Sequence, residues 1–151
     1  METKDVDTRA ARDFLGRVRE LRSLIESKTR KMETLRDMAE STTGHMSDMP
    51  RCASPDLQRM ETAMCKVADL ELEIAEDRVA MEQAKEAITA ALCDLDDYRE
   101  QQVLFYRYVE CLSWAHVFTE SGYGKSTVYR YHDAGLTHMA QALMSRDVAK
   151  A

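Results

Sequence analysis

Polar residues near the C-terminal end of the 151-residue chain have the types and spacing that nucleic-acid binding requires. In a helix, residues three and four positions apart share one face, so these side chains point outward together if the segment is helical. An arginine on that face donates two hydrogen bonds to a guanine edge, and lysine and hydroxyl groups bind phosphate oxygens or bases. The candidate DNA-binding residues are Ser113, Lys125, Ser126, Thr127, Tyr129, Arg130 and Asp133.

Three helices are needed to hold these residues in place. Apolar periodicity predicts a first helix over 98–111, a short second helix capped by Ser113, and a third helix that starts near Lys125. Gly122 and Gly124 lie between the last two, where a turn is expected. A short helix, a glycine-containing turn and a longer helix are the layout of a helix-turn-helix, whose second helix enters the DNA major groove.

The same segment resembles a known family. Residues 112–118 (Leu-Ser-Trp-Ala-His-Val-Phe) and 121–132 (Ser-Gly-Tyr-Gly-Lys-Ser-Thr-Val-Tyr-Arg-Tyr-His) are similar to region 4 of sigma-70-type RNA polymerase sigma factors. They resemble more closely the sigma-region-4-like regulators of bacteriophages and prophages, with ArpU-type late transcription regulators among their relatives. The resemblance implies a transcription regulator whose partners are duplex DNA and RNA polymerase. It covers about residues 94–143, and the matching positions are Asp97, Arg99, Leu104, Arg107, Tyr108, Ser113, Trp114, Val117, Gly122, Tyr123, Val128, Tyr129, Arg130 and His132.

Two long helices are predicted before this unit, so the whole chain is expected to be all-α. Apolar residues recur in steps of three and four over about 3–40 and again over 55–93, in heptad patterns typical of a coiled coil. Turn-forming residues fill 41–54, which predicts a loop. The sequence therefore predicts a long antiparallel helical hairpin in residues 1–93. A three-helix, sigma-region-4-like helix-turn-helix DNA-binding domain follows in residues 94–151.

Charged residues interrupt the two heptad seams at Lys28 and Asp77. A fold-back centred near residue 48 places Lys28 beside Asp69 and Asp77 beside Arg19, which gives each charge a partner. Each long helix spans about 35 residues, or roughly 50 Å, and needs another helix along its length. That other helix belongs either to the same hairpin or to a second chain, so a homodimer through the long helices is also open.

The net charge of −6 argues against a protein that coats nucleic acid non-specifically. The acidity is concentrated in residues 41–93, which carry five basic and ten acidic residues. The first helix is instead rich in arginine. These arginines either contact phosphates or form a solvated face paired with Asp13, Glu20 and Glu26, and the second arrangement is the commoner one. They are Arg9, Arg12, Arg17, Arg19 and Arg22.

Several classes of function lack their sequence signals. We expect no metal or cofactor, because neither the histidines nor the cysteines have metal-ligand spacing, and the cysteines are expected to be reduced thiols. No activated nucleophile, phosphate-binding glycine loop or paired carboxylates are recognisable, so we expect no enzymatic activity. No apolar run of about 18 residues and no signal-peptide pattern occur, which predicts a cytoplasmic protein without membrane contact. The cysteines are Cys52, Cys65, Cys93 and Cys111.

Two functions of different classes fit these patterns. The first is a sequence-specific, double-stranded DNA-binding transcriptional regulator of phage or prophage type, which reads DNA with the helix that starts near Lys125. The alternative is a coiled-coil structural, assembly or packaging protein whose C-terminal helical unit binds protein or loads DNA. The two differ in one measurable property, because only the regulator requires a preferred duplex sequence.

Overall fold

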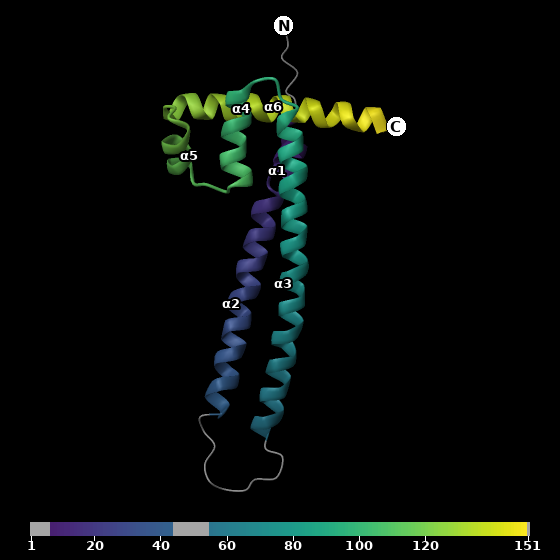
Figure 1. The fold of residues 1–151 in the computed structure, drawn as a ribbon, viewed down its shortest axis with the longest axis vertical. Helices are drawn as coiled ribbons and strands as arrows, with labels where there is room; N and C mark the ends of the chain where they lie inside the picture. The colour runs from purple at the N-terminus through teal and green to yellow at the C-terminus, as the bar shows by residue number, and fades with distance from the viewer. Residues whose placement is uncertain (1–6, 44–54, 151) are drawn as a thin grey trace. The chain divides into compact units, whose positions relative to one another are not determined.

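The structure of the chain is a computed structural model that describes residues 7–43 and 55–150. Within these ranges the chain forms helices and no strand, which confirms the predicted all-α class. None of the helices in these ranges is long and apolar enough to cross a membrane. In chain order (Figure 1), the elements are α1 (Arg9–Leu15), α2 (Arg17–Thr43), α3 (Pro55–Cys93), α4 (Tyr98–Leu104), the π-helix η1 (Phe105–Val109), α5 (Trp114–Ser121) and α6 (Lys125–Lys150).

The chain forms two compact units. The aromatic unit comprises residues 1–20 and 81–151, and the hairpin unit comprises residues 21–80. The sequence-based division at residue 93 therefore separates residues that share one core. Leu15 of α1 and Ile88 of α3 are buried in the same cluster as Leu136 of α6. The heptad pattern of apolar residues continues through residue 91, but the last part of α3 packs with the C-terminal helices, so the pattern does not mark where the unit begins.

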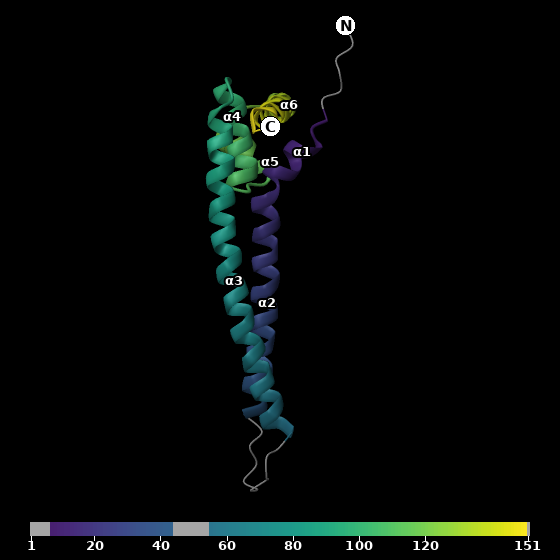
Figure 2. The same cartoon turned by 90° about the vertical axis from the view of Figure 1, so that its right-hand side faces the viewer.

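In the hairpin unit, α2 and α3 lie side by side and antiparallel (Figures 1 and 2), as predicted. The direction follows from two ion pairs, Lys28 with Asp77 and Arg36 with Glu71, because the partner number falls as the first number rises. Small and medium apolar side chains fill the seam between the helices. The buried ones are Leu21, Ala39, Ala63, Val67, Leu70 and Ile74.

The predicted register of the hairpin is wrong. The Nζ atom of Lys28 lies 2.7 Å from Asp77 and 3.3 Å from Glu73, instead of beside Asp69. Asp77 therefore pairs with Lys28 and not with Arg19. The midpoint between paired residues falls near residue 53 rather than 48, because the two charged seam residues pair with each other. A shift of this size is about one helical turn along each arm.

The boundaries of the long helices also differ from the prediction. The first helix was expected to run unbroken over 3–40, but it begins at Arg9 and divides at Gly16 into α1 and α2. Residues 41–43 of the expected loop are helical, while the rest of that loop lies outside the described residues, as does Ser54, its expected helix cap. The second long helix begins at Pro55, as expected from the preference of proline for the first helical position.

The aromatic unit has two apolar cores. The larger joins α1, the end of α3, α4 and the middle of α6, and its fully buried side chains include Leu15, Ile88, Leu104 and Met139. The smaller holds α5 against α4 and α6 through Val103, Val117 and Val128, which are all 0% exposed. Figure 1 shows α4 and α5 beside the first part of α6. Partly buried aromatic and apolar side chains surround the smaller core: Tyr106, Leu112, Trp114, Phe118, Tyr123 and Tyr131.

One glycine allows α4 and α6 to approach closely. A Cβ atom at Gly135 would lie 2.8 Å from Cδ1 and 3.2 Å from Cγ of Leu104. The first of these distances is shorter than real Cβ contacts permit. An alanine at Gly135 would therefore force the Leu104 side chain or α6 to move.

The helix predicted over 98–111 ends early and in an unusual geometry. After Leu104 the chain continues as the π-helix η1, in which the Glu110 N–H donates to the carbonyl of Phe105 at 3.1 Å. Cys111 then has a φ of 55°, a left-handed conformation that ends the helix. The change of pitch rotates the side chains of η1 relative to a regular α-helix, and Arg107 and Tyr108 lie in this segment.

Candidate nucleic-acid interface

Both ends of α5 are defined by local backbone chemistry. The hydroxyl oxygen of Ser113 accepts a hydrogen bond from the His116 N–H at 3.4 Å, and it lies 2.7 Å from the His116 ring nitrogen Nδ1. At the other end, Gly122 has a φ of 74° and its N–H donates to the carbonyl of Phe118. Glycine is favoured at such a C-cap because it has no Cβ. The predicted helix, turn and helix order is therefore present from Ser113 onward.

The first turns of α6 expose most of the predicted contact residues. Lys125, Ser126, Arg130 and Asp133 are exposed, and Thr127 is half-buried. No acidic residue occurs in the first turn of α6, so the positive end of the helix dipole is not neutralised there. We call Lys125, Ser126, Arg130 and Asp133 the α6 face. The structure thus brings four of the seven predicted residues together on an accessible surface.

Two of the predicted residues have evident structural roles. The ring of Tyr129 packs edge-on against Trp114 and Phe118, with centroid distances of 5.0 and 5.7 Å, so it joins α6 to α5. Ser113 is the N-cap of α5 and is partly committed to that role. Tyr129 and Ser113 therefore position the α6 face through α5, whatever further contacts they make.

Arg130 belongs to a group of stacked charged and aromatic side chains. Its guanidinium lies 5.5 Å from the ring centroid of Tyr131, and Arg99 of α4 lies 5.2 Å from the same centroid. The Tyr131 ring also packs edge-on against Tyr123 at 5.5 Å. Tyr131, and to a lesser degree Asp97, raises the pKa of Arg99 above its ordinary value. Arg99 is only a position of the family resemblance and not a predicted contact residue, because nothing along the chain shows that it lies against the same tyrosine ring as Arg130.

A second group surrounds Trp114 at the start of α5. Arg107 stacks over the Trp114 ring at 4.4 Å, and His132 of α6 lies edge-on to it at 5.0 Å. His132 is 7% exposed, and its Nε2 lies 2.7 Å from the hydroxyl oxygen of Tyr108. Burial lowers the pKa of His132, while its contact with Asp133 at 3.2 Å opposes that change. His132 therefore favours its neutral form and fixes the side of α6 that faces η1.

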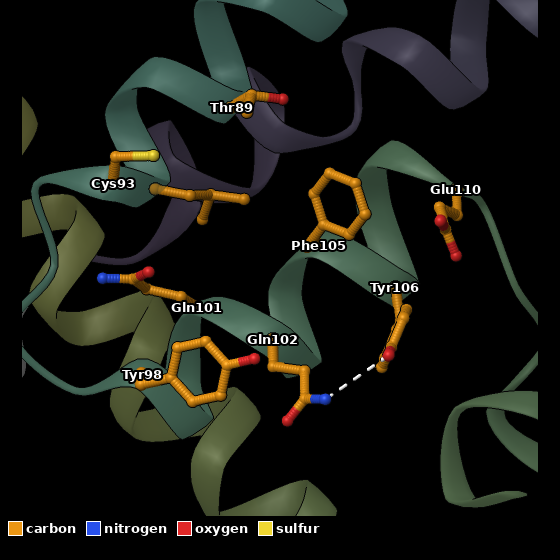
Figure 3. Close-up of a pocket in the computed structure, with 9 residues that line it drawn as sticks. Thr89, Cys93, Tyr98, Gln101, Gln102, Phe105, Tyr106 and Glu110 are labelled. Carbon is orange, nitrogen blue, oxygen red and sulfur yellow. Dashed lines mark hydrogen bonds between the residues drawn. The ribbon is translucent and has the colours of Figure 1, made fainter. Parts of the chain in front are cut away.

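The structure also contains a pocket of about 380 Å³ in the aromatic unit (Figure 3). Its walls come from the end of α3, from α4 and from η1. Phe105 and the exposed Tyr98 present their rings to it, and the Gln102 amide donates to the Tyr106 hydroxyl at 3.3 Å. None of the predicted contact residues lines this pocket. It is a feature separate from the α6 face.

The chemistry of the site is that of a binding surface. The α6 face offers a guanidinium, an ammonium and hydroxyl donors on a helix that two aromatic groups hold in place, and this set suits phosphate and base-edge recognition. Within the described ranges, no three metal-ligating side chains come together. Comparison of the chain with protein-family models, curated proteins and solved structures finds no match. The fold and the site define an all-α protein with a candidate nucleic-acid interface.

Proposed function

We propose that this protein is a sequence-specific, double-stranded DNA-binding transcriptional regulator of phage or prophage type, which acts in the cytoplasm. The observation that carries the proposal is the α6 face, a polar and accessible helix start that follows a short capped helix and a three-residue turn. This arrangement matches the requirement that a recognition helix packs on one side and presents its first turns to the major groove.

In this proposal Arg130 reads a base and Lys125 binds the backbone. Arg130 lies about one and a half turns into α6, and its planar guanidinium suits the paired acceptors O6 and N7 of guanine. Lys125 is the first residue of α6 and suits a phosphate, which carries no sequence information. Ser126 and Thr127, which lie between Lys125 and Arg130 in the sequence, supply hydroxyl groups. Asp133 sits at the end of the α6 face and disfavours a phosphate there.

A homodimer through the hairpin unit is the second part of the proposal. A single helix-turn-helix reads few base pairs, so a second copy is expected on a typical operator. The helix α3 carries a second row of apolar side chains that α2 does not cover, with Met64 49%, Leu72 67% and Val79 59% exposed. Ala68 and Ala75 lie in the same row and are exposed too. A second copy of α3 provides a matching row.

The dimer is tested separately from DNA binding. Replacing Leu72 with Glu places a charge in the middle of the apolar row, so we expect light scattering to report a monomer. The control is Lys66→Glu, which introduces the same residue at an exposed position on a different side of α3. A wild-type protein that is monomeric at micromolar concentration contradicts the dimer, but it leaves the α6 face to be judged by DNA binding.

The DNA-binding proposal is tested by selection from random duplexes followed by binding measurements on the enriched site. We expect Arg130→Ala to relax specificity at one base position by about 1–3 kcal/mol, and Lys125→Ala to weaken binding to all sequences alike. The matched control is Arg146→Ala, because Arg146 is exposed on the same helix and pairs with Asp94. Failure to enrich any sequence at low salt contradicts the proposal.

The exposed apolar row on α3 also favours the alternative, a coiled-coil assembly or packaging protein. Such a protein would form larger oligomers through this row and would retain duplex DNA without a sequence preference, if it binds DNA at all. RNA polymerase is a partner implied by the family resemblance alone. Retention of purified polymerase by the immobilised protein, measured with and without operator DNA, tests that partner independently.

A further inference from the structure

Two arginines from different elements, Arg19 and Arg107, are in contact beside the start of α5, and a third, Arg12, lies near them. The Arg19 guanidinium of α2 donates to the carbonyl of Arg107 at 3.2 Å, and the Arg107 guanidinium donates to the carbonyl of Leu112 at 2.8 Å. Arg107 also stacks over Trp114. Arg12 of α1 is close enough for its charge to act on Tyr108 and His132, the residues next to Arg107 and Trp114. We call Arg12, Arg19 and Arg107 the arginine cluster.

The positive charge of the arginine cluster is not balanced. Among the described residues, no carboxylate lies within ion-pair distance of any of the three guanidiniums. Other arginines of the same helix behave differently, because Arg17 pairs with Glu20 and Arg22 pairs with Glu26. Asp133 acts on the neighbouring Tyr108, but its carboxylate lies 3.2 Å from the His132 ring and not beside the three guanidiniums. Three like charges held together without a counter-charge favour binding of an anion.

The geometry of the cluster favours a phosphate over a base. Arg107 is half-buried and its guanidinium is fixed by Leu112 and Trp114, so it cannot reach far into a groove. Arg12 is exposed and Arg19 is half-buried, which leaves donors directed to solvent. Burial and the charge of Arg19 both lower the pKa of Arg107. An anion bound beside the two arginines would offset the repulsion between their charges.

We propose that the arginine cluster binds a backbone phosphate of duplex DNA beside the site contacted by the α6 face, so that α1 and α2 take a direct part in DNA binding. This inference rests on the proposed function. It assigns α1 and the start of α2 a contact in addition to their packing role. It also separates four arginines of the first helices into two groups, the ion-paired Arg17 and Arg22 and the phosphate-binding Arg12 and Arg19.

The test uses the full-length protein and variants of Arg12 and Arg19. Fluorescence anisotropy of a labelled duplex, measured across a range of salt concentrations, gives both affinity and the number of phosphates neutralised. Each lost phosphate contact makes the slope of log K against log salt shallower by about 0.9, so Arg12→Gln with Arg19→Gln, which removes the contact to the one phosphate bound by the cluster, should make it shallower by about 0.9. The loss should be equal on a selected and on an unrelated duplex, because phosphates carry no sequence information.

Two control variants and the wild type separate the effect of charge from effects on folding and from the proposed function. Arg17→Gln removes a charge from the same helix at an ion-paired position and should leave the slope unchanged. Arg12→Lys with Arg19→Lys keeps the charge and should retain most of the slope. If the wild type binds DNA and the double Gln variant has the same salt slope as Arg17→Gln, the proposed phosphate site is wrong, but the proposed function is not contradicted. If the wild type binds no duplex at low salt, both are wrong.

Discussion

The aromatic unit and the hairpin unit are stabilised by different side chains. All three Phe, all six Tyr and the only Trp of the chain lie in residues 1–20 and 81–151, and residues 21–80 contain no aromatic residue. The aromatic unit packs large rings at fixed angles around α5 and α6. The hairpin unit packs a row of small and aliphatic side chains between two helices. Specific geometry is therefore concentrated where the candidate interface is.

This difference has a functional meaning. A recognition helix must be held within a fraction of an ångström, and interlocking rings restrict its rotation and tilt. A hairpin seam built from repeating heptads tolerates small shifts along its length, because each layer resembles the next. The hairpin unit thus suits oligomerisation or spacing, whereas the aromatic unit suits recognition.

The largest expected difference concerns the cost of a cavity. Leu104 is 0% exposed in the larger core of the aromatic unit, and replacing it with Ala should lower the free energy of unfolding by about 2–5 kcal/mol. Leu70, 8% exposed in the hairpin seam, is the matched substitution and should cost about 2 kcal/mol or less, because a two-helix seam relaxes more readily. Urea unfolding followed by far-ultraviolet circular dichroism measures both, and equal losses contradict the comparison.

Trp114 fluorescence refines the same measurement. Trp114 is the only tryptophan and lies in the aromatic unit, so its emission reports that unit, while circular dichroism reports all helices. If the units differ as described, Leu70→Ala should move the circular dichroism transition more than the fluorescence transition. Coincident shifts by both probes indicate a single cooperative transition.

The next effect concerns the close approach of α4 and α6. Gly135→Ala adds a Cβ atom 2.8 Å from Leu104 Cδ1, so the Leu104 side chain or α6 must move within a packed core, and we expect a loss of about 1–3 kcal/mol. Gly124→Ala is the matched control, because a Cβ there meets nothing within 4 Å. Gly124 is the N-cap of α6, where Gly is preferred to Ala, so the cost of this substitution should be about 1 kcal/mol or less. Denaturant midpoints of the two variants test this, and a neutral Gly135→Ala would show that the helices are not in tight contact.

A pH dependence is expected from the aromatic unit. Burial lowers the pKa of His132, so the unfolded chain binds this proton more readily than the folded one. Stability is therefore full above the ordinary histidine pKa of about 6.5 and decreases as the pH falls below it toward the lower pKa of folded His132. His132→Gln should remove this part of the pH dependence, and exposed His116→Gln should retain it. Unfolding midpoints at several pH values measure the difference between the two variants. If the pH dependence of the midpoint is unchanged in His132→Gln, a group other than His132 causes it.

Heptad periodicity was sufficient to predict much of the fold. The all-α class, the antiparallel hairpin, the start of α3 at Pro55 and the start of α6 at Lys125 all follow from local patterns of apolar and turn-forming residues. The register did not follow, because an antiparallel pairing depends on which distant residues meet, and heptads repeat identically after each shift. The same limit applies to the unit boundary, since the apolar row of α3 continues unbroken into the aromatic unit.

The candidate site was predictable only in part. Exposure of Arg130 and Lys125 follows from helical periodicity around buried Val128. The packing of Tyr129 on Trp114 could not be predicted in this way. Tyr129 precedes the exposed Arg130, and its position in the helix is compatible with either a solvent-exposed or a packed ring. The arginine cluster depends on the π-helical turn at η1 and on contacts between residues far apart in sequence. These features belong to tertiary structure and have no local signal.

The smallest effect is expected for the charged layer of the hairpin seam, where Lys28 and Asp77 are both mostly buried as side chains. Asp77→Leu alone leaves Lys28 without its main partner and should lower the melting temperature, while Lys28→Leu with Asp77→Leu should restore or slightly raise it, because an apolar layer avoids desolvating two charges. The charged layer would then serve to fix the register, since Lys28 has its hydrogen-bonded partner at only one alignment. Cysteines introduced at positions 36 and 71 report that alignment by disulfide formation. If the double Leu variant melts well below the wild type, the pair contributes stability and not register, and the hairpin unit depends on specific contacts as much as the aromatic unit does.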